Sequence, residues 1–362
     1  MTIEIREMRG DDEARELRRV GRRAFHPVFS LILPKPKWAY GLFEDGVCLG
    51  GVILKQIGTI GLVDWIFLSK AARGRGLAKR LVVAALDAFA EQGLTKVAAL
   101  VRDDNTASWN LFAARGLKAV TPLDLIRQLG IRDAVRISFA SNMVVAYGFD
   151  LWIGTLEDAL DPSDPEYVSL ADTAPGNFLT TLLWHLSLNL LPAIAVIWRH
   201  NGSPVHWLIA LSALLLLRLA LAYAGSLPFY QPVRLRAGRG GYIIAVPNQL
   251  LGGLLFHPAF WHPAVPRWRE PDYRSGLGVS ASLGVIGTMG LIAVSSLLLA
   301  RGTLQSTMAI GIAGTIVQAG KLILIMELQP LFEAWSGRRI LRWSLIAYFA
   351  VLAAGVAVII WA

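Results

Sequence analysis

The chain has 362 residues, of which 54% are hydrophobic, and its mean hydropathy is +0.50. Hydropathy that high excludes an ordinary soluble enzyme over the whole length. The net charge of +9 raises the question of nucleic acid, but many of the cations lie between the apolar runs of the second half, where the positive-inside rule explains them. We therefore expect a lipid bilayer, and no nucleic acid, as a partner.

The first 150 residues mix charged and apolar positions as a globular domain does. Their periodicity predicts an α/β domain with a mixed central sheet flanked by helices. The expected strands are Thr2–Arg6, Trp38–Phe43, Val47–Gln56, Leu62–Leu68, Val97–Val101, Leu117–Val120 and one near Met143–Tyr147. The expected helices are Asp11–Phe25, Leu77–Glu91, Ala107–Arg115 and one near Leu123–Leu129. The charged N-terminus has no apolar h-region, so we expect this domain to stay in the cytoplasm.

Residues 151–176 carry acids and prolines and are predicted to be a linker. Residues 177–362 contain apolar runs long enough to cross about 30 Å of hydrocarbon as helices. They predict an all-α transmembrane bundle, and a multi-pass protein of a bacterial cytoplasmic membrane. The spans are expected at about 177–198, 206–225, 242–260, 279–300, 306–326 and 340–362.

The segment 242–260 is the uncertain span, because prolines and glycines interrupt it at Pro247, Gly252, Gly253 and Pro258. If it crossed the membrane, the arginines at 267, 269 and 274 would lie outside, against the positive-inside rule. A re-entrant segment would keep them inside. The sequence therefore leaves five or six spanning helices open.

The stretch from Asp64 to Arg80, "DWIFLSKAARGRGLAKR", joins a predicted strand to a predicted helix through a basic, glycine-rich turn. Such a turn binds anions, because backbone N–H groups point outward at the helix N-terminus and glycine lets a phosphate approach closely. It is neither a Walker A loop nor a GxGxxG fingerprint, since its glycines stand only at 74 and 76. Four cations surround it: Arg73, Arg75, Lys79 and Arg80.

The run Arg73–Ala78, "RGRGLA", resembles the [QR]xxGx[GA] signature of the GNAT N-acetyltransferases. A second run, Arg102–Val120, resembles that family's Asn-x-x-Ala-x-x-x-Tyr-x-x-x-Gly-Phe motif. Its positions are occupied here by Asn105, Ser108, Phe112, Gly116 and Leu117. The resemblance covers about residues 1–150, and the remainder of the chain resembles no family that we recognise.

The resemblance implies acetyl-CoA as co-substrate and no metal. It places the pyrophosphate on the turn and the pantetheine arm alongside the preceding strand, whose amides would polarise the thioester carbonyl. The implied coenzyme-binding residues are Ile66, Phe67, Leu68, Arg73, Gly74, Arg75, Gly76, Leu77, Ala78, Lys79, Asn105 and Phe112. The single cysteine, Cys48, independently excludes a CxxC zinc site.

The catalytic groups are less clear. Phe112 stands where the family often has the Tyr that protonates the leaving thiolate, and Tyr40 is a possible replacement acid. Asp64 lies early on the strand before the turn, where some family members place an acid, and could act as a base through water. An ordinary strand-edge aspartate is the simpler interpretation.

Four ionisable residues lie inside the apolar runs: His185, Arg218, Lys321 and Glu327. Arg218 is deep enough that it should face the bundle interior, whereas Lys321 and Glu327 could snorkel to the cytosolic interface. His185 and Asn189 are four residues apart and could line a polar pocket or make interhelical hydrogen bonds.

Together these features predict a membrane-anchored N-acetyltransferase whose acceptor is an amphiphilic or membrane-bound amine. Two alternatives stay open. The intramembrane charges suit a transporter coupled to acetylation, and Phe112 suits an acyl-CoA sensor that does not turn over.

Overall fold

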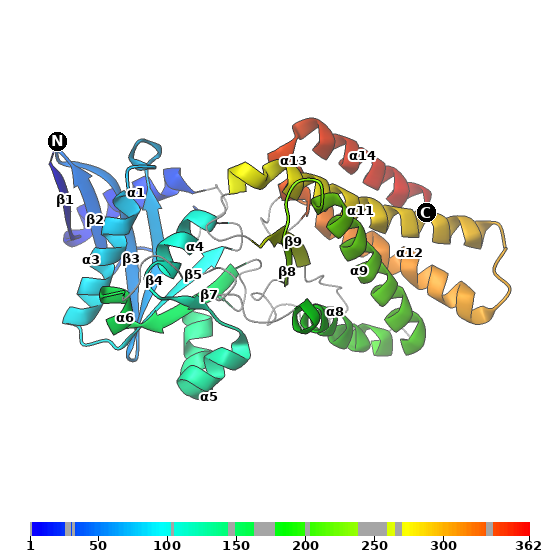
Figure 1. Cartoon of the computed structure of the whole chain (residues 1–362), viewed down its shortest axis with the longest axis horizontal. Helices are drawn as coiled ribbons and strands as arrows, with labels where there is room; N and C mark the ends of the chain where they lie inside the picture. The colour runs from blue at the N-terminus through cyan, green and yellow to red at the C-terminus, as the bar shows by residue number, and fades with distance from the viewer. Residues whose placement is uncertain are drawn as a thin grey trace. The chain divides into compact units, whose positions relative to one another are not determined.

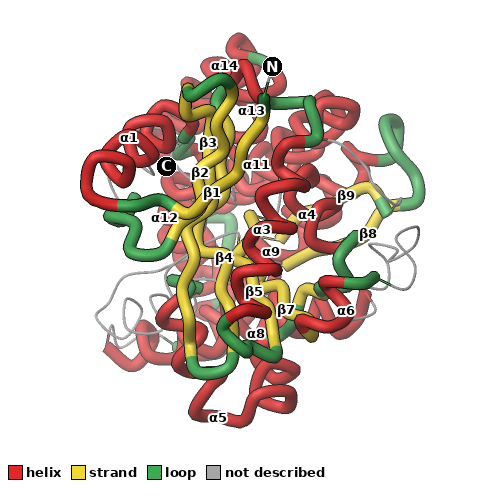
Figure 2. The backbone as a smooth tube through the Cα atoms, turned by 90° about the vertical axis from the view of Figure 1, so that its left-hand side faces the viewer, coloured by secondary structure: helices red, strands yellow, loops and turns green. Residues whose placement is uncertain are grey.

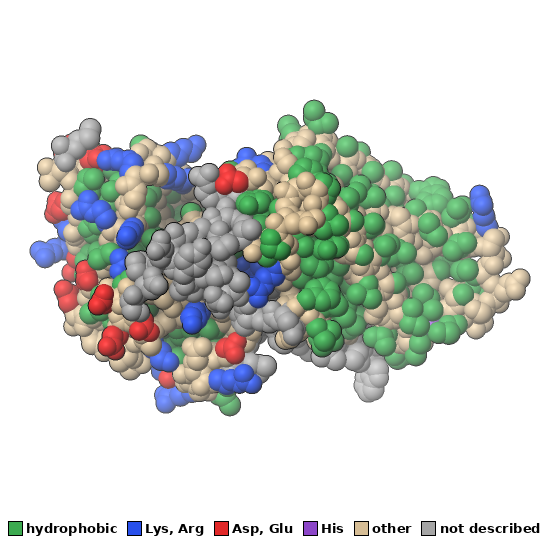
Figure 3. Space-filling model, viewed as in Figure 1, with side chains coloured by type: hydrophobic (Ala, Val, Ile, Leu, Met, Phe, Trp, Pro, Cys, Tyr) green, Lys and Arg blue, Asp and Glu red, His purple; other side chains and the backbone are tan. Residues whose placement is uncertain are grey.

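The computed structural model describes residues 2–25, 30, 33–102, 105–143, 149–162, 178–199, 203–237, 259–264, 270–330 and 336–362. The chain divides into two compact units, one formed mostly by residues before 175 and one formed mostly by residues 175–362. In the space-filling view, charged side chains gather on the first unit and hydrophobic side chains cover the helices of the second (Figure 3). Each unit is described by itself.

The first unit is built on a seven-stranded mixed sheet in the order β1-β2-β3-β4-β5-β7-β6 (Figure 1). The first four strands are antiparallel neighbours, β4 pairs with β5 in parallel, and β6 pairs with β7 antiparallel. The strands are β1 (Ile3–Glu7), β2 (Ala39–Glu44), β3 (Val47–Ile57), β4 (Ile60–Leu68), β5 (Lys96–Arg102), β6 (Lys118–Ala119) and β7 (Phe149–Thr155).

Two long helices cover opposite faces of this sheet, as Figure 2 shows for α1 and α3. Leu17 of α1 is fully buried in a cluster with Phe43 and Phe67, whereas Phe89 of α3 packs over Gly61 on the other face, where a side chain would clash with its ring. The helices of the unit are α1 (Gly10–Ala24), the 3-10 helix η1 (Lys70–Ala72), α3 (Leu77–Glu91), α4 (Thr106–Ala113), α5 (Pro122–Ala140) and α6 (Leu156–Leu160).

Two sequence expectations for this unit need correction. The helix expected near Leu123–Leu129 continues to Ala140, because the chain kinks at Gly130, whose φ is +74°, rather than ending there. The strand expected near Met143–Tyr147 lies at Phe149–Thr155, and α6 follows it. Residues 151–160 are therefore part of the first unit rather than of a linker, since Leu151 and Trp152 are buried in the sheet. Residues 144–148 and 163–177 lie outside the described residues.

The second unit is mainly helical. Its helices are α8 (Phe178–Arg199), α9 (Pro204–Ser226), α11 (Glu270–Ala300), α12 (Thr307–Leu328), α13 (Ser336–Trp343) and α14 (Leu345–Trp361). Among the described residues, three helices are long and apolar enough to span a membrane: Pro204–Ser226, Pro271–Ala300 and Thr307–Leu328. The expected number of five or six spans is not confirmed.

The last expected span, 340–362, is two helices rather than one. The chain breaks at Ser344, whose hydroxyl accepts a hydrogen bond from the Ala347 amide at 3.2 Å and so caps α14. The short helix α13, before the break, carries arginines on a strongly amphipathic surface. α14 alone has 17 residues, which is short for a full crossing.

The second unit is not all-α, because β8 (Val233–Ala237) and β9 (Ala259–Pro263) pair as a two-stranded antiparallel sheet. Ala259 and Phe260, the end of the segment expected to cross or re-enter the membrane, belong to β9. Their extended conformation shows that this segment does not end as a helix. Residues 238–258, which include the rest of that segment, lie outside the described residues.

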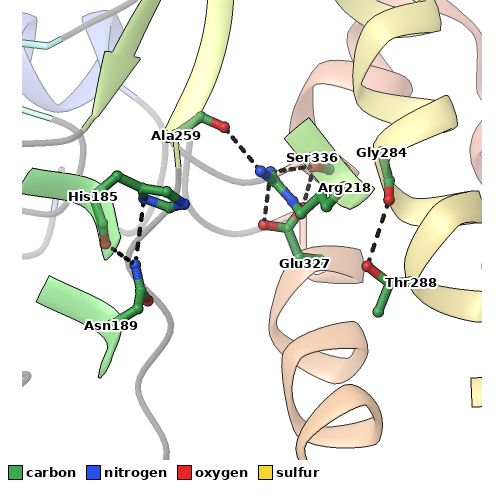
Figure 4. A network of polar contacts seen from close by, with 8 residues as sticks. All are labelled: His185, Asn189, Arg218, Ala259, Gly284, Thr288, Glu327 and Ser336. Carbon is green, nitrogen blue, oxygen red and sulfur yellow. Dashed lines mark hydrogen bonds and ion pairs between the residues drawn. The ribbon is translucent and has the colours of Figure 1, made fainter. Parts of the chain in front are cut away.

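A buried ion pair ties the second unit together (Figure 4). The Arg218 guanidinium on α9 donates to Glu327 Oε1 on α12 at 3.0 Å and to the Ala259 carbonyl on β9 at 2.9 Å. The Ser336 hydroxyl on α13 donates to the same carboxylate. Arg218 thus faces the interior as expected, but Glu327 does not snorkel, because its side chain is 1% exposed and bonded to Arg218.

The polar pair His185 and Asn189 is also buried (Figure 4). The Asn189 amide donates to the His185 carbonyl at 2.8 Å, and its nitrogen lies 3.3 Å from His185 Nδ1. These contacts run along α8 itself. Because they lie within one helix, they support neither the interhelical hydrogen bonds nor the polar pocket expected from the sequence.

We predict that Arg218→Leu destabilises the second unit by about 3 kcal/mol, because it leaves the Glu327 carboxylate buried without its cation. The double variant Arg218→Leu/Glu327→Leu should recover most of that loss. Thermal unfolding of the full chain in detergent measures both. Equal destabilisation in the single and double variants would contradict a role for the ion pair itself.

Candidate functional site

The turn between β4 and α3 owes its shape to two glycines. η1 is followed by Gly74 with φ +77° and Gly76 with φ +74°, and Gly76 is the N-cap of α3. A Cβ at either position would meet no atom within 4 Å, so space does not require glycine there. The left-handed backbone requires it, because that conformation strains other L-residues. The expected glycine-rich turn and the start of the helix at Leu77 are both present.

The N-terminus of α3 has no side-chain cap, since Gly76 has no side chain to accept a hydrogen bond. Its first N–H groups therefore point outward without intrahelical acceptors, apart from the Lys79 amide, which donates to the Gly76 carbonyl at 3.1 Å. Open N–H groups at the positive end of a helix dipole attract an anion.

The arginines of the turn make hydrogen bonds and ion pairs with other groups of the protein. Arg73 Nε donates to the Leu68 carbonyl at 3.3 Å, and Arg75 forms a two-pronged pair with Glu44, with Nη1 3.1 Å from Oε2. Hydrogen bonding to Arg75 holds the pKa of Glu44 below its usual value. Arg80 donates to the Ile3 carbonyl at 3.4 Å. Among the four cations of the turn, Lys79 is the one whose ammonium makes no hydrogen bond or ion pair with the described residues.

Strand β4 loses its parallel partner halfway along. Its pairing with β5 ends at Val63–Ala99 among the described residues, although β4 continues to Leu68 and β5 to Arg102. On its other side β4 stays paired with β3 up to Leu68, but Asp64 is skipped in the register as a bulge. A bulge bends its strand, which accounts for the separation of β4 from β5.

We call the backbone of residues 64–68 on the side away from β3 the open edge of β4. The Ser69 amide donates to the Leu49 carbonyl of the β3 segment at 2.7 Å. Because backbone groups of an antiparallel strand alternate sides, Phe67 also bonds toward β3, whereas the amides of Ile66 and Leu68 face the open edge. These amides lie on the side where an extended ligand could pair with the strand.

Asp64, at the bulge, is buried and paired. Its side chain is 3% exposed, and Lys55 Nζ of β3 lies 3.0 Å from Oδ2. Burial raises the pKa of Asp64, and the neighbouring Lys55 opposes that rise. Lys55 also donates to the Ala140 carbonyl at the end of α5 at 3.2 Å. These contacts favour a positioning role for Asp64, in which the carboxylate fixes the bulge, over that of a base.

Tyr40 lies two strands from β4, in register with Val52 and, through it, with Ile66. Burial raises the pKa of its hydroxyl, and the carboxylates of Glu7, Glu91 and Asp87 raise it further. Asp87 and Glu91 belong to the C-terminal part of α3, about 16 Å or more along the helix from the turn. The structure does not bring Tyr40 next to the turn.

Phe112 of α4 is 2% exposed and packs in the core of the first unit. It carries no group that could protonate a thiolate. The backbone N–H of Asn105, just before α4, donates to the Arg102 carbonyl at the end of β5 at 3.0 Å. Lys55 is the site residue that sequence analysis missed, because nothing in the local pattern of β3 indicates a partner on the neighbouring strand.

No group of three or more His, Cys, Asp or Glu side chains that could hold a metal ion occurs within the described residues.

The family model of the acetyltransferase (GNAT) family matches residues 5–117. No curated protein matches the chain. Solved structures similar to it include a ribosomal-protein alanine N-acetyltransferase from Escherichia coli, with 13% identity, 43% of this chain and 94% of that chain covered, and a TM-score of 0.33.

Two further structures were determined with coenzyme A. PaiA N-acetyltransferase from Thermoplasma acidophilum has 15% identity over 43% of this chain and 99% of that chain, with a TM-score of 0.32. N-acetylglutamate synthase from Neisseria gonorrhoeae, complexed also with N-acetyl-glutamate, has 21% identity over 43% of this chain and 35% of that chain, with a TM-score of 0.32.

We predict that Gly76→Asp weakens binding of coenzyme A to the full chain by about tenfold or more. A carboxylate a few ångströms from a phosphate costs on the order of 1–4 kcal/mol, and the left-handed backbone is strained as well. Titration calorimetry measures the affinity. Gly58→Asp is the matched control, since Gly58 has φ +60° and an open Cβ position in the β3–β4 turn. Equal losses in both variants would contradict an anion site at Gly76.

If Asp64 positions the bulge, Asp64→Asn should keep acetyl transfer within about tenfold of the unchanged protein and leave its pH profile unchanged. Removing a general base costs on the order of 10²–10⁴ in rate. Lys55→Met should raise the pKa of Asp64 further, because Lys55 holds it down, and should lower the unfolding temperature. A large loss of rate in Asp64→Asn, with an altered pH profile, would assign the base instead.

Proposed function

We propose that the chain is a membrane-anchored N-acetyltransferase, because the model of the acetyltransferase (GNAT) family matches residues 5–117. It transfers the acetyl group of acetyl-CoA to the amine of an amphiphilic or membrane-bound acceptor. The observation that carries the proposal is the combination, in one chain, of an uncapped helix N-terminus beside the open edge of β4 with three apolar helices long enough to span a membrane.

In this proposal the pyrophosphate of acetyl-CoA lies on the amides of the turn and first helical residues, 73–79, with Lys79 as the available cation. The pantetheine arm pairs with the open edge through the amides of Ile66 and Leu68. The match of the acetyltransferase (GNAT) family model to residues 5–117 supports this choice of co-substrate.

The reaction is a direct attack. The neutral amine of the acceptor forms a bond to the thioester carbonyl carbon, the carbon–sulfur bond breaks, and the proton lost by the amine balances the thiolate that leaves. Amides of the open edge stabilise the charge that develops on the carbonyl oxygen. Since Phe112 cannot donate a proton, we propose that water protonates the thiolate, while Asp64 fixes the bulge that creates the open edge.

The proposed class of acceptor follows from the tether, by which we mean the three apolar helices that would anchor the chain in a membrane. A domain held beside a bilayer meets membrane-bound amines at a high effective concentration, whereas soluble amines gain nothing from the tether. The arginines of the second unit, on β8 and α13, suit the cytoplasmic side of a bacterial membrane by the positive-inside rule. We therefore propose that the acetyltransferase domain is cytoplasmic, where acetyl-CoA would reach it.

The test is release of coenzyme A thiol by the full chain in lipid nanodiscs, with pairs of amines that share one head and differ only in alkyl length. We expect turnover to rise with chain length, and to disappear in Gly76→Asp with every amine. Equal turnover of the short and long members of each pair would contradict the membrane-delivered acceptor while leaving the acetyltransferase intact.

A sensor that binds acetyl-CoA without turnover is the second candidate, and the buried Phe112 favours it. Coenzyme binding without thiol release across all amines would support the sensor. For the transporter alternative no observation is decisive, because the Arg218 charge is already matched by Glu327.

A further inference from the structure

The second half of α5 exposes three large apolar side chains in a row. Ile131 is 70% exposed, Val135 49% and Phe139 55%. They are spaced four residues apart, so they cover about 80° of the helix surface. We call them the α5 stripe. Single exposed apolar residues are common, but a contiguous stripe on one helix usually marks a contact surface.

The α5 stripe lies on a different side of the helix from the residues that pack into the core. Ala134 and Ile137 of the same helix are buried and form the inward side. The Lys55 ammonium, which donates to the Ala140 carbonyl, holds the end of the helix against β3. α5 therefore has an ordinary apolar side packed on the domain and a second apolar side facing outward.

Cations adjoin the stripe. Arg132 and Arg136 follow its members in the sequence and lie about 100° and 140° around the helix from Ile131, next to Phe139. Both are exposed, and Arg136 lies 3.7 Å from Asp133, which is turned further away. An apolar stripe bordered by arginines is the pattern of a helix that lies in a membrane interface, with its apolar side in the acyl boundary and its cations at anionic headgroups.

We propose that the α5 stripe docks on the surface of an anionic lipid bilayer and so orients the acetyltransferase domain on the membrane. Two observations favour a lipid surface as the binding partner of the stripe: the arginines beside it, and the three helices of the same chain that are long and apolar enough to span a membrane. The docking goes beyond the proposed function but rests on its membrane anchor, and it requires neither acetyl-CoA nor an acceptor.

The test uses the full chain in vesicles that contain anionic lipid, with an environment-sensitive fluorophore on Val135→Cys. Arg19→Cys on α1, also exposed, is the matched control. The native Cys48 does not interfere, because it is buried and burial raises the pKa of its thiol to about 11, which keeps it protonated and unreactive toward maleimide at neutral pH.

We expect the label at position 135 to emit at shorter wavelength in vesicles and to be quenched by lipids brominated on the upper acyl chain, while the label at position 19 is not. Quenching should fall in Arg132→Gln/Arg136→Gln. Emission at position 135 that matches position 19 would overturn the proposal. A short-wavelength emission that brominated lipid does not quench would also overturn it, because protein rather than lipid would then cover the stripe.

Discussion

The separation of β4 from β5 after Val63–Ala99 is the constraint on which the candidate site depends. A strand paired on both sides has no backbone groups to offer. β4 keeps β3 on one side, whereas on the other side no described strand pairs with the amides of Ile66 and Leu68. The bulge at Asp64 produces this separation, and Lys55 neutralises the buried carboxylate there. One strand thus continues into the turn and helix that present the anion-binding amides.

Sequence patterns predicted the parts of the site that are set locally. The two glycines, the helix start at Leu77 and the preceding strand follow from turn chemistry and periodicity within a few residues. The Asp64–Lys55 pair could not be predicted in the same way, because it depends on the register between two strands. β7 was misplaced for a related reason: it is a strand because it pairs with β6, while its acidic surroundings resemble a linker.

The second unit shows the same division between local and long-range information. Apolar run lengths predicted α9 and α12 closely, whereas α11 begins at Glu270 and not at the expected residue 279. The depth of Arg218 predicted that it faces inward. These sequence features did not predict the partner of Arg218, because Glu327 lies 109 residues away in the sequence and its position allowed it to reach the membrane interface. The pair also explains how charge is tolerated here: the guanidinium and carboxylate satisfy each other, with Ser336 and the Ala259 carbonyl completing the network.

The most direct test of the account is amide hydrogen exchange of the full chain in nanodiscs, with and without coenzyme A. We expect slower exchange at Ile66 and Leu68 and at the amides of residues 74–79, with little change in β1 or β2. Protection of the turn together with alternate residues of β4 would show that the coenzyme pairs with the open edge. Unchanged exchange at these amides, under conditions where coenzyme A is bound, would contradict the central claim.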